Sequence, residues 1–170
     1  MSDTKKDIEM LNDSLGGEYF GIAAYDAAMG TGLLEDAVRD VARKFQGDHK
    51  QHAQRIQEAI RNLGGKPVEA RSWEAYASEY PPPPLKTQVD VLRYAASLEE
   101  SAASASVASV AGFSSPELAV LAASIAGVEA MHWSALLGAL GESPVPVSFI
   151  PLPEVSAAAD SNDRLASASA

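Results

Sequence analysis

Residues 45–56 read FQGDHKQHAQRI and place two histidines where a helical bundle needs apolar side chains. In an α-helix, positions three or four residues apart share one face. His49 and His52 therefore continue an apolar stripe along this predicted helix. The apolar members of the stripe are Leu34, Val38, Val41, Phe45, Ile56, Ile60 and Leu63. Two of the three histidines of the chain thus lie on a face that is predicted to be buried.

The third histidine, His132, lies in a stretch that repeats this pattern. Residues 125–136 read IAGVEAMHWSAL, and alignment with the first stretch places Glu129 opposite His49. His132 then coincides with His52. The repeat predicts an internal duplication with an approximate two-fold axis, to which each half contributes one paired motif.

Apolar periodicity predicts four long helices. The one strand-like pattern is VPVSFIPLP near the end of the sequence, and prolines interrupt it. The predicted helices span residues 4–29, 33–63, 88–111 and 116–140. Thr87 and Ser115 are typical N-cap residues. Thr4, followed three residues later by Asp7, is typical of a capping box. Short turns make one hairpin of the first two helices and another of the last two.

A long connection separates the two predicted hairpins. Residues 64–87 read GGKPVEARSWEAYASEYPPPPLKT, and loops of that length are uncommon inside compact domains. A crossover that runs the length of a bundle explains it, and Trp73, Tyr76 and Tyr80 are spaced for a short amphipathic helix packed on that bundle. The sequence therefore predicts an all-α fold, an antiparallel four-helix bundle with a long crossover between its second and third helices.

Composition narrows the class of protein further. A chain of 170 residues with 46% hydrophobic residues suits one globular domain, which we place at residues 1–153, followed by a flexible Ala/Ser-rich tail at 154–170. The net charge of -10 disfavours nucleic acid as a partner. The lack of cysteine excludes disulfides, thiolate metal sites and thiol catalysis. Neither a secretion signal nor a membrane span is predicted, so we expect no membrane partner and a cytoplasmic location.

Each helical stripe is interrupted near its middle by polar side chains. The set is Glu18, His49, His52, Glu99, Glu129 and His132. Burying a lone carboxylate is costly, so three carboxylates on inner faces of a bundle indicate compensation by metal ions. Carboxylate with imidazole suits iron, manganese or zinc. No Ser-His-Asp arrangement and no phosphate-binding glycine loop accompanies them, so no catalytic or cofactor-binding residue is predicted beyond these six.

Three motifs resemble those of the ferritin-like superfamily of carboxylate-bridged di-metal bundles. They are LGGEYFGIAAY at residues 15–25, LEESAASAS at 98–106 and VEAMHW at 128–133. The most similar members are single-chain bacterial ferritin-like proteins related to desiccation-associated ones, and the resemblance covers about residues 4–153. In that family one Glu comes from each of two helices and a Glu-x-x-His motif from each of the other two. The resemblance implies Glu18 and Glu99 as single ligands and two divalent metal ions, with iron first and manganese or zinc as alternatives.

One position departs from the family pattern. The family has Glu where this chain has His49, so its second motif reads His-x-x-His. Three carboxylates and three imidazoles remain, one potential bridging carboxylate is lost, and two divalent ions would be less neutralised. A zinc site, a mononuclear site, an unequal pair or a lapsed site are therefore alternatives to a standard di-iron centre. Asp48, at the edge of the stripe, is a candidate to contact a ligand.

Two functions of different classes are expected, the first implied by the resemblance and the second favoured by the departure at His49. The first is iron and oxygen handling, ferroxidase-like, peroxide-consuming or otherwise related to oxidative stress, with metal ions and oxygen or peroxide as partners. The second is a structural or binding module that dimerises and holds zinc, one metal or none, without turnover. We expect a homodimer, and whether the protein is an enzyme stays open. Tyr25 is expected to be a core aromatic residue whose hydroxyl finds an acceptor, with a redox role as the alternative.

Overall fold

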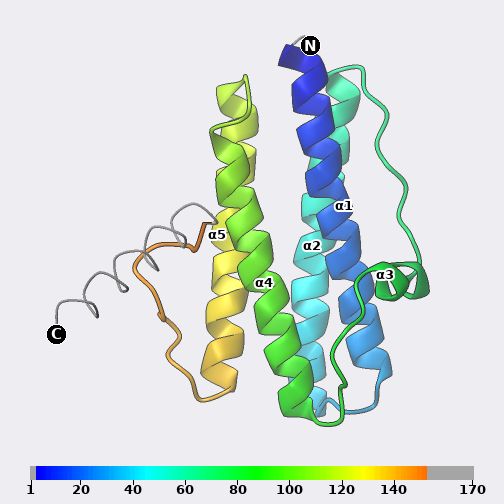
Figure 1. Ribbon diagram of the computed structural model, residues 1–170, viewed down its shortest axis with the longest axis vertical. Coiled ribbons are helices and arrows are strands. Elements are labelled where there is room, and N and C mark those ends of the chain that lie inside the picture. Colours follow the sequence, from blue (N-terminus) through cyan, green and yellow to red (C-terminus); the bar gives the residue numbers. More distant parts are fainter. Residues whose placement is uncertain (1–2, 153–170) are drawn as a thin grey trace, which may run out of the picture.

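The computed structural model describes residues 3–152, and within them the chain forms five helices and no strand. The helices are α1 (Asp3–Gly30), α2 (Asp36–Asn62), α3 (Trp73–Glu79), α4 (Gln88–Val110) and α5 (Pro116–Ala139). The four long helices lie alongside one another as a bundle (Figure 1). This confirms the predicted all-α bundle. The predicted tail at 154–170 lies outside the described residues.

Two hairpins build the bundle, α1 with α2 and α4 with α5. The chain leaves α2 at the end of the bundle where α1 begins and returns along its side to the opposite end, where α4 starts (Figure 1). The short helix α3 lies on this crossover and packs on α1, since the Tyr76 ring meets the Phe20 ring edge-on with centroids 5.3 Å apart. The long crossover between α2 and α4 and its short aromatic helix are therefore both confirmed.

Hydrogen bonds define the starts of two long helices as predicted. The Thr87 hydroxyl accepts a bond from the Asp90 backbone N–H, and the Asp90 carboxylate accepts one from the Thr87 N–H, so α4 begins with a capping box. The Ser115 hydroxyl accepts a bond from the Leu118 N–H at 3.4 Å and caps α5. Both caps satisfy backbone donors that the first turn of a helix leaves unpaired.

The capping box predicted for Thr4 and Asp7 is wrong. Thr4 lies inside α1, which begins at Asp3. The Asp7 side chain is buried and accepts hydrogen bonds from the backbone N–H of Ser114, at 2.9 Å, and from the Ser114 hydroxyl. Ser114 lies in the turn between α4 and α5, so Asp7 ties α1 to the other hairpin instead of capping its own helix.

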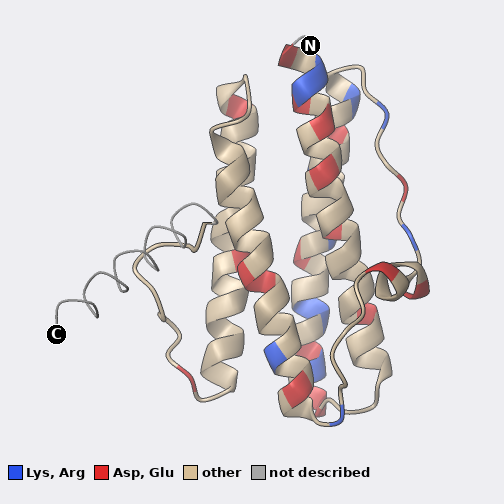
Figure 2. Ribbon diagram, in the orientation of Figure 1, with Lys and Arg blue, Asp and Glu red and all other residues tan. Residues whose placement is uncertain are grey.

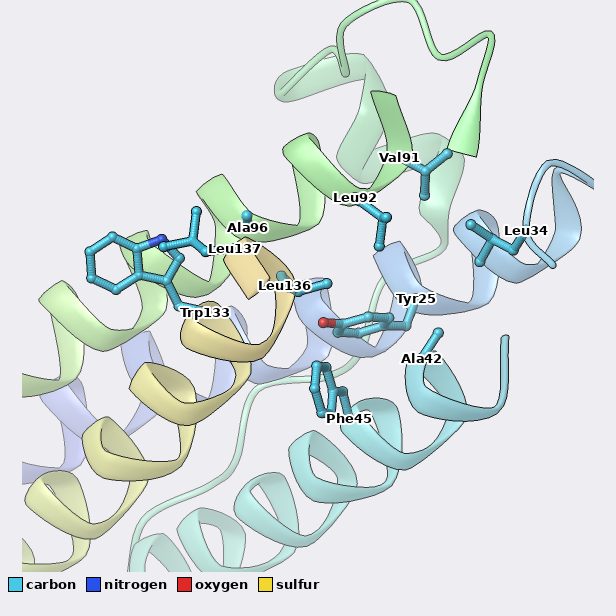
Figure 3. Close-up of a cluster of buried hydrophobic side chains, with 10 residues drawn as sticks. All are labelled: Tyr25, Leu34, Ala42, Phe45, Val91, Leu92, Ala96, Trp133, Leu136 and Leu137. Atoms are coloured by element: carbon cyan, nitrogen blue, oxygen red, sulfur yellow. The ribbon is translucent and has the colours of Figure 1, made fainter. Parts of the chain in front are cut away.

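The apolar core is divided into two clusters along the bundle. The first comprises Tyr25, Leu34, Ala42, Phe45, Val91, Leu92, Ala96, Trp133, Leu136 and Leu137 (Figure 3). The second comprises Leu11, Leu15, Ala53, Ile56, Ile60, Leu118 and Ile125. Along α2, Phe45 belongs to the first cluster and Ala53 to the second, and His49 and His52 lie between them. A polar layer therefore separates two dry layers of the bundle.

Helix α5 is the one described helix that is long and apolar enough to cross a membrane by length and composition alone. The core helix of a bundle meets the same criterion. In this fold α5 packs along α4, and its Glu129 and His132 side chains are buried. Its composition therefore fits its place in the bundle.

Candidate metal centre

The six polar residues predicted from the sequence lie together in the layer between the two apolar clusters. They form two overlapping groups whose nitrogen and oxygen atoms lie within 4.8 Å of one another. One group comprises Glu18, His49, His52 and Glu129, and the other comprises His49, Glu99, Glu129 and His132. Four helices contribute to the site, because α1 and α4 each supply one Glu while α2 and α5 each supply a pair three residues apart. Five of the six are buried, with Glu129 at 0% exposure, and His52 is partly exposed.

Glu129 and His49 belong to both groups, and they are the two residues that the internal repeat aligns. Glu129 presents Oε1 to His52 Nδ1 at 3.0 Å and Oε2 to His132 Nδ1 at 3.4 Å. His49 presents Nδ1 to a Glu18 oxygen at 2.8 Å and Nε2 to a Glu99 oxygen at 3.3 Å. Each shared residue thus points one ligand atom at each group. The two aligned residues therefore both lie between the groups, although Glu129 faces two histidines and His49 faces two carboxylates.

Several ligand atoms of this cluster are buried without a hydrogen bond. Within residues 3–152, every buried side-chain nitrogen or oxygen that lacks a hydrogen-bond partner belongs to it. These atoms are His52 Nδ1, Glu99 Oε2, Glu129 Oε1, Glu129 Oε2 and His132 Nδ1. Buried polar atoms are nearly always paired, and leaving one unpaired costs about 1–3 kcal/mol. Carboxylate and imidazole atoms converging in this way fit a divalent metal ion, which would satisfy them together.

The charges of the cluster balance only while the histidines hold protons. Burial opposes a charged His49 ring, but contacts with Glu18 and Glu99 outweigh it and raise the pKa of His49 to about 11. Burial is likewise outweighed at His52 and His132, where the neighbouring carboxylates raise each pKa to about 9. The same contacts overcome burial at Glu18 and Glu99 and lower the pKa of both carboxyls. A metal ion would have to displace protons from these rings in order to bind.

Residues around the cluster orient its members. Asp48 Oδ2 lies 3.2 Å from His132 Nε2, so Asp48 contacts one of the candidate ligands as expected. The Phe45 ring stacks on His132 with centroids 3.9 Å apart. The Tyr25 hydroxyl donates a hydrogen bond to Glu99 Oε1, which identifies the acceptor expected for this core tyrosine. A carboxylate such as that of Asp48, bonded to one ring nitrogen, holds a ligating imidazole in one orientation.

Gly21 has a role at the site that the sequence analysis missed. The His49 ring lies against α1 at this position, and a Cβ there would come 3.1 Å from His49 Cε1. A glycine therefore allows the ring to approach the α1 backbone. The available signal was its position three residues after Glu18, which places both on one face of α1.

A polar cavity leads to His52 between α2 and α5. Its volume is about 570 Å³. The lining includes Gln51, Arg55, Glu58 and Ser124 together with His52. This opening explains why His52 is the least buried of the six cluster residues.

Comparisons with known proteins show which proteins this chain resembles. Residues 6–142 match the sequence profile of a family described as ferritin-like domain. A crystal structure of a conserved hypothetical protein from Mycobacterium tuberculosis has a TM-score of 0.72 at 20% identity, over 87% of this chain and 99% of that one. A crystal structure described as ferritin like, diiron-carboxylate proteins from Bacillus anthracis str. Ames has a TM-score of 0.67 at 24% identity, over 82% of this chain and 99% of that one. A search of curated proteins found no significant match. At sequence identities of 20% and 24%, these structural similarities show that this chain shares the fold of the two proteins.

Proposed function

The chain belongs to the ferritin-like domain family, and from that premise we propose that its buried cluster binds divalent metal ions and acts on iron with oxygen or peroxide. The observation that carries this proposal is the set of buried ligand atoms without hydrogen-bond partners, all in one cluster of the described residues. These atoms face one another at 3.0–3.4 Å as ion pairs that lack hydrogen-bond geometry. Coordination of a cation would pair all of them at once.

Two ions, one at each group, fit the ligand set. Glu18 and His52 would hold one, and Glu99 and His132 the other. Glu129 would lie between them, because each of its oxygens faces a different histidine. Iron is the first choice and manganese or zinc the alternatives, because all three accept mixed carboxylate and imidazole ligands.

The side chains around the ligands have distinct roles in this proposal. A bound divalent ion supplies Lewis-acid chemistry and, in the case of iron or manganese, electrons for reaction with oxygen or peroxide. Asp48 holds the His132 ring, and Tyr25 holds the Glu99 carboxylate. The apolar clusters on either side of the layer limit the access of water to the ligands.

One observation favours a second candidate function. His49 occupies the position equivalent to Glu129, and its two nitrogens face Glu18 and Glu99. The site therefore has one carboxylate fewer than a symmetrical pair of Glu-x-x-His motifs would provide. This favours a single ion or zinc in a structural or dimerising module without turnover. The homodimer, the cytoplasmic location and the role in oxidative stress stay predictions.

Elemental analysis tests the proposal and separates the two functions. Protein from cells supplied with iron, manganese and zinc should contain metal, and Glu129→Gln should lose most of it because Glu129 belongs to both groups. Iron(II)-dependent consumption of oxygen or peroxide that disappears in Glu129→Gln supports the first function. Bound metal without any such consumption supports the second. A folded wild-type protein without metal contradicts both metal-binding proposals.

A further inference from the structure

A second and larger cavity reaches the cluster from between α1 and α4. Its volume is about 740 Å³, within the range of small-molecule binding sites. At about 1.5 Å of rise per residue, the α1 positions that line it, from Met10 to Ala28, span about 27 Å. The cavity is therefore long and narrow, and it follows the helices.

Small side chains create this space. The facing positions are Gly17, Gly21, Ala24 and Ala28 on α1, with Ala95, Ala102, Ala105 and Ser106 on α4. Each hairpin is tightly packed within itself, whereas α1 and α4 belong to different hairpins and meet through these positions. Glycine, alanine and serine are too small to fill the volume between the two helices. The small side chains of the two facing helices therefore leave the space between them open.

The inner side of the cavity is formed by members of the metal cluster. Glu18, His49 and Glu99 line it, as does Tyr25. Glu99 is 2% exposed, and its Oε2 is one of the buried atoms without a hydrogen-bond partner. A molecule in the cavity would therefore have apolar walls along its length and the cluster at one point.

The charge of the lining restricts what the cavity can hold. Its acidic members are Asp13, Glu18 and Glu99, and neither Lys nor Arg is among the described residues that line it. His49 also lines it, but both of its ring nitrogens already face Glu18 and Glu99. Few positions along α4 are charged (Figure 2). In the metal-free protein, no basic side chain of the described lining is therefore left to pair with the phosphate or carboxylate of an anionic ligand. The lining favours a neutral molecule.

We propose that the cavity between α1 and α4 binds a neutral, elongated apolar molecule whose single polar end lies at the Glu/His cluster. This molecule would be the substrate of the Glu/His cluster. Any reaction at its polar end therefore rests on the proposed function of that cluster. The apolar walls would bind the chain by burying its surface. The polar cavity between α2 and α5 leaves a separate route to His52 for water and ions.

Binding of 1-dodecanol tests this proposal, with dodecanoate as its anionic counterpart. Titration calorimetry is done on metal-free and cobalt(II)-loaded protein. Gly17→Leu fills the cavity, since a Cβ at Gly17 meets no atom within 4 Å and the residue lines the cavity. Gly16→Leu is the matched control, because Gly16 is equally open and is the preceding residue but is not part of the lining. Circular dichroism confirms that both variants fold.

We expect 1-dodecanol to bind the wild type and Gly16→Leu equally well and to bind Gly17→Leu at least tenfold more weakly. In the metal-free protein it should bind more tightly than dodecanoate. Binding should also change the visible spectrum of the cobalt(II) protein, because the polar end lies at the metal. Equal binding to Gly17→Leu, tighter binding of dodecanoate to the metal-free protein, or an unchanged spectrum overturns the proposal. The proposal is also overturned if the wild type does not bind 1-dodecanol but forms a dimer that Gly17→Leu dissociates. That result would assign the cavity to contact with a second copy of the chain. If cobalt(II) does not bind, the proposed function fails, whereas binding to the metal-free protein still tests the cavity.

Discussion

The Nδ1 atom of His49 lies 3.5 Å from Oε1 of Glu129, so the two residues that the internal repeat aligns face each other within the cluster. Both belong to the two ligand groups, yet one is an imidazole and the other a carboxylate. The duplication is thus symmetrical in position and asymmetrical in charge. We expect this asymmetry to decide how many ions the site binds and how tightly it binds them.

Replacing His49 with Glu should restore the missing carboxylate. Four carboxylates would neutralise two divalent ions, so we expect His49→Glu to hold two ions per chain and to bind the second at least tenfold more tightly than the wild type does. Without metal the variant should lose roughly 3 kcal/mol of folding free energy, because a buried ion pair is replaced by repelling carboxylates. Metal titration followed by urea unfolding measures both effects. A variant that binds no more metal than the wild type contradicts the assignment of His49.

Adding a methyl group at Gly21 should disturb the site without weakening the fold. The new Cβ would press on the His49 ring at 3.1 Å, whereas Gly17 has open space around the same position. We expect Gly21→Ala to lower metal affinity by about tenfold, on the order seen when the orientation of a ligand is disturbed. Gly17→Ala is the control, and it should gain up to about 1 kcal/mol from its higher helix propensity while keeping its affinity. Equal affinities of the two variants would show that His49 does not depend on this contact.

Asp7 should matter for stability and not for metal. Its buried carboxylate accepts two hydrogen bonds from Ser114, at the end of the bundle. Asp7→Ala should therefore lose about 1–3 kcal/mol, because the Ser114 N–H is left without its partner. A double-mutant cycle with Ser114→Ala, measured by urea unfolding, isolates the hydroxyl contribution. Metal content should be that of the wild type, and a parallel loss of metal would refute the separation of the two roles.

Removing the Tyr25 hydroxyl should affect the metal-free protein more than the metal-bound one. Tyr25→Phe leaves Glu99 Oε1 without its hydroxyl donor, at a cost of about 1–3 kcal/mol for a buried acceptor. A metal ion bound to Glu99 would offset much of that cost. Thermal unfolding with and without metal measures the difference. If the loss is equal in both states, Glu99 does not ligate.

The members of the cluster could be predicted because each helix contributes them locally. His49 with His52, and Glu129 with His132, are three residues apart, and that spacing alone places each pair on one face. The same periodicity places Glu99 on the inner face of its helix, and Glu99 lies in the cluster. The order of helices and the long connection then indicated which faces meet.

Contacts between distant segments could not be predicted in this way. Asp7 reads as part of a local capping box, and nothing near it in the sequence indicates Ser114, which lies 107 positions away. The approach of His49 to Gly21 and the cavity between α1 and α4 depend on the distance between helices. Periodicity shows which way a side chain faces and leaves that distance undetermined.

Anomalous X-ray scattering at the iron, manganese and zinc edges tests the central claim most directly. Crystals should be grown from protein produced in cells supplied with all three metals. We predict anomalous peaks bounded by Glu129 and the histidines at one or both ligand groups, with the strongest signal at the iron edge. Density without any anomalous peak, with the three histidines paired only to the three carboxylates, would contradict the claim that this cluster is a metal centre.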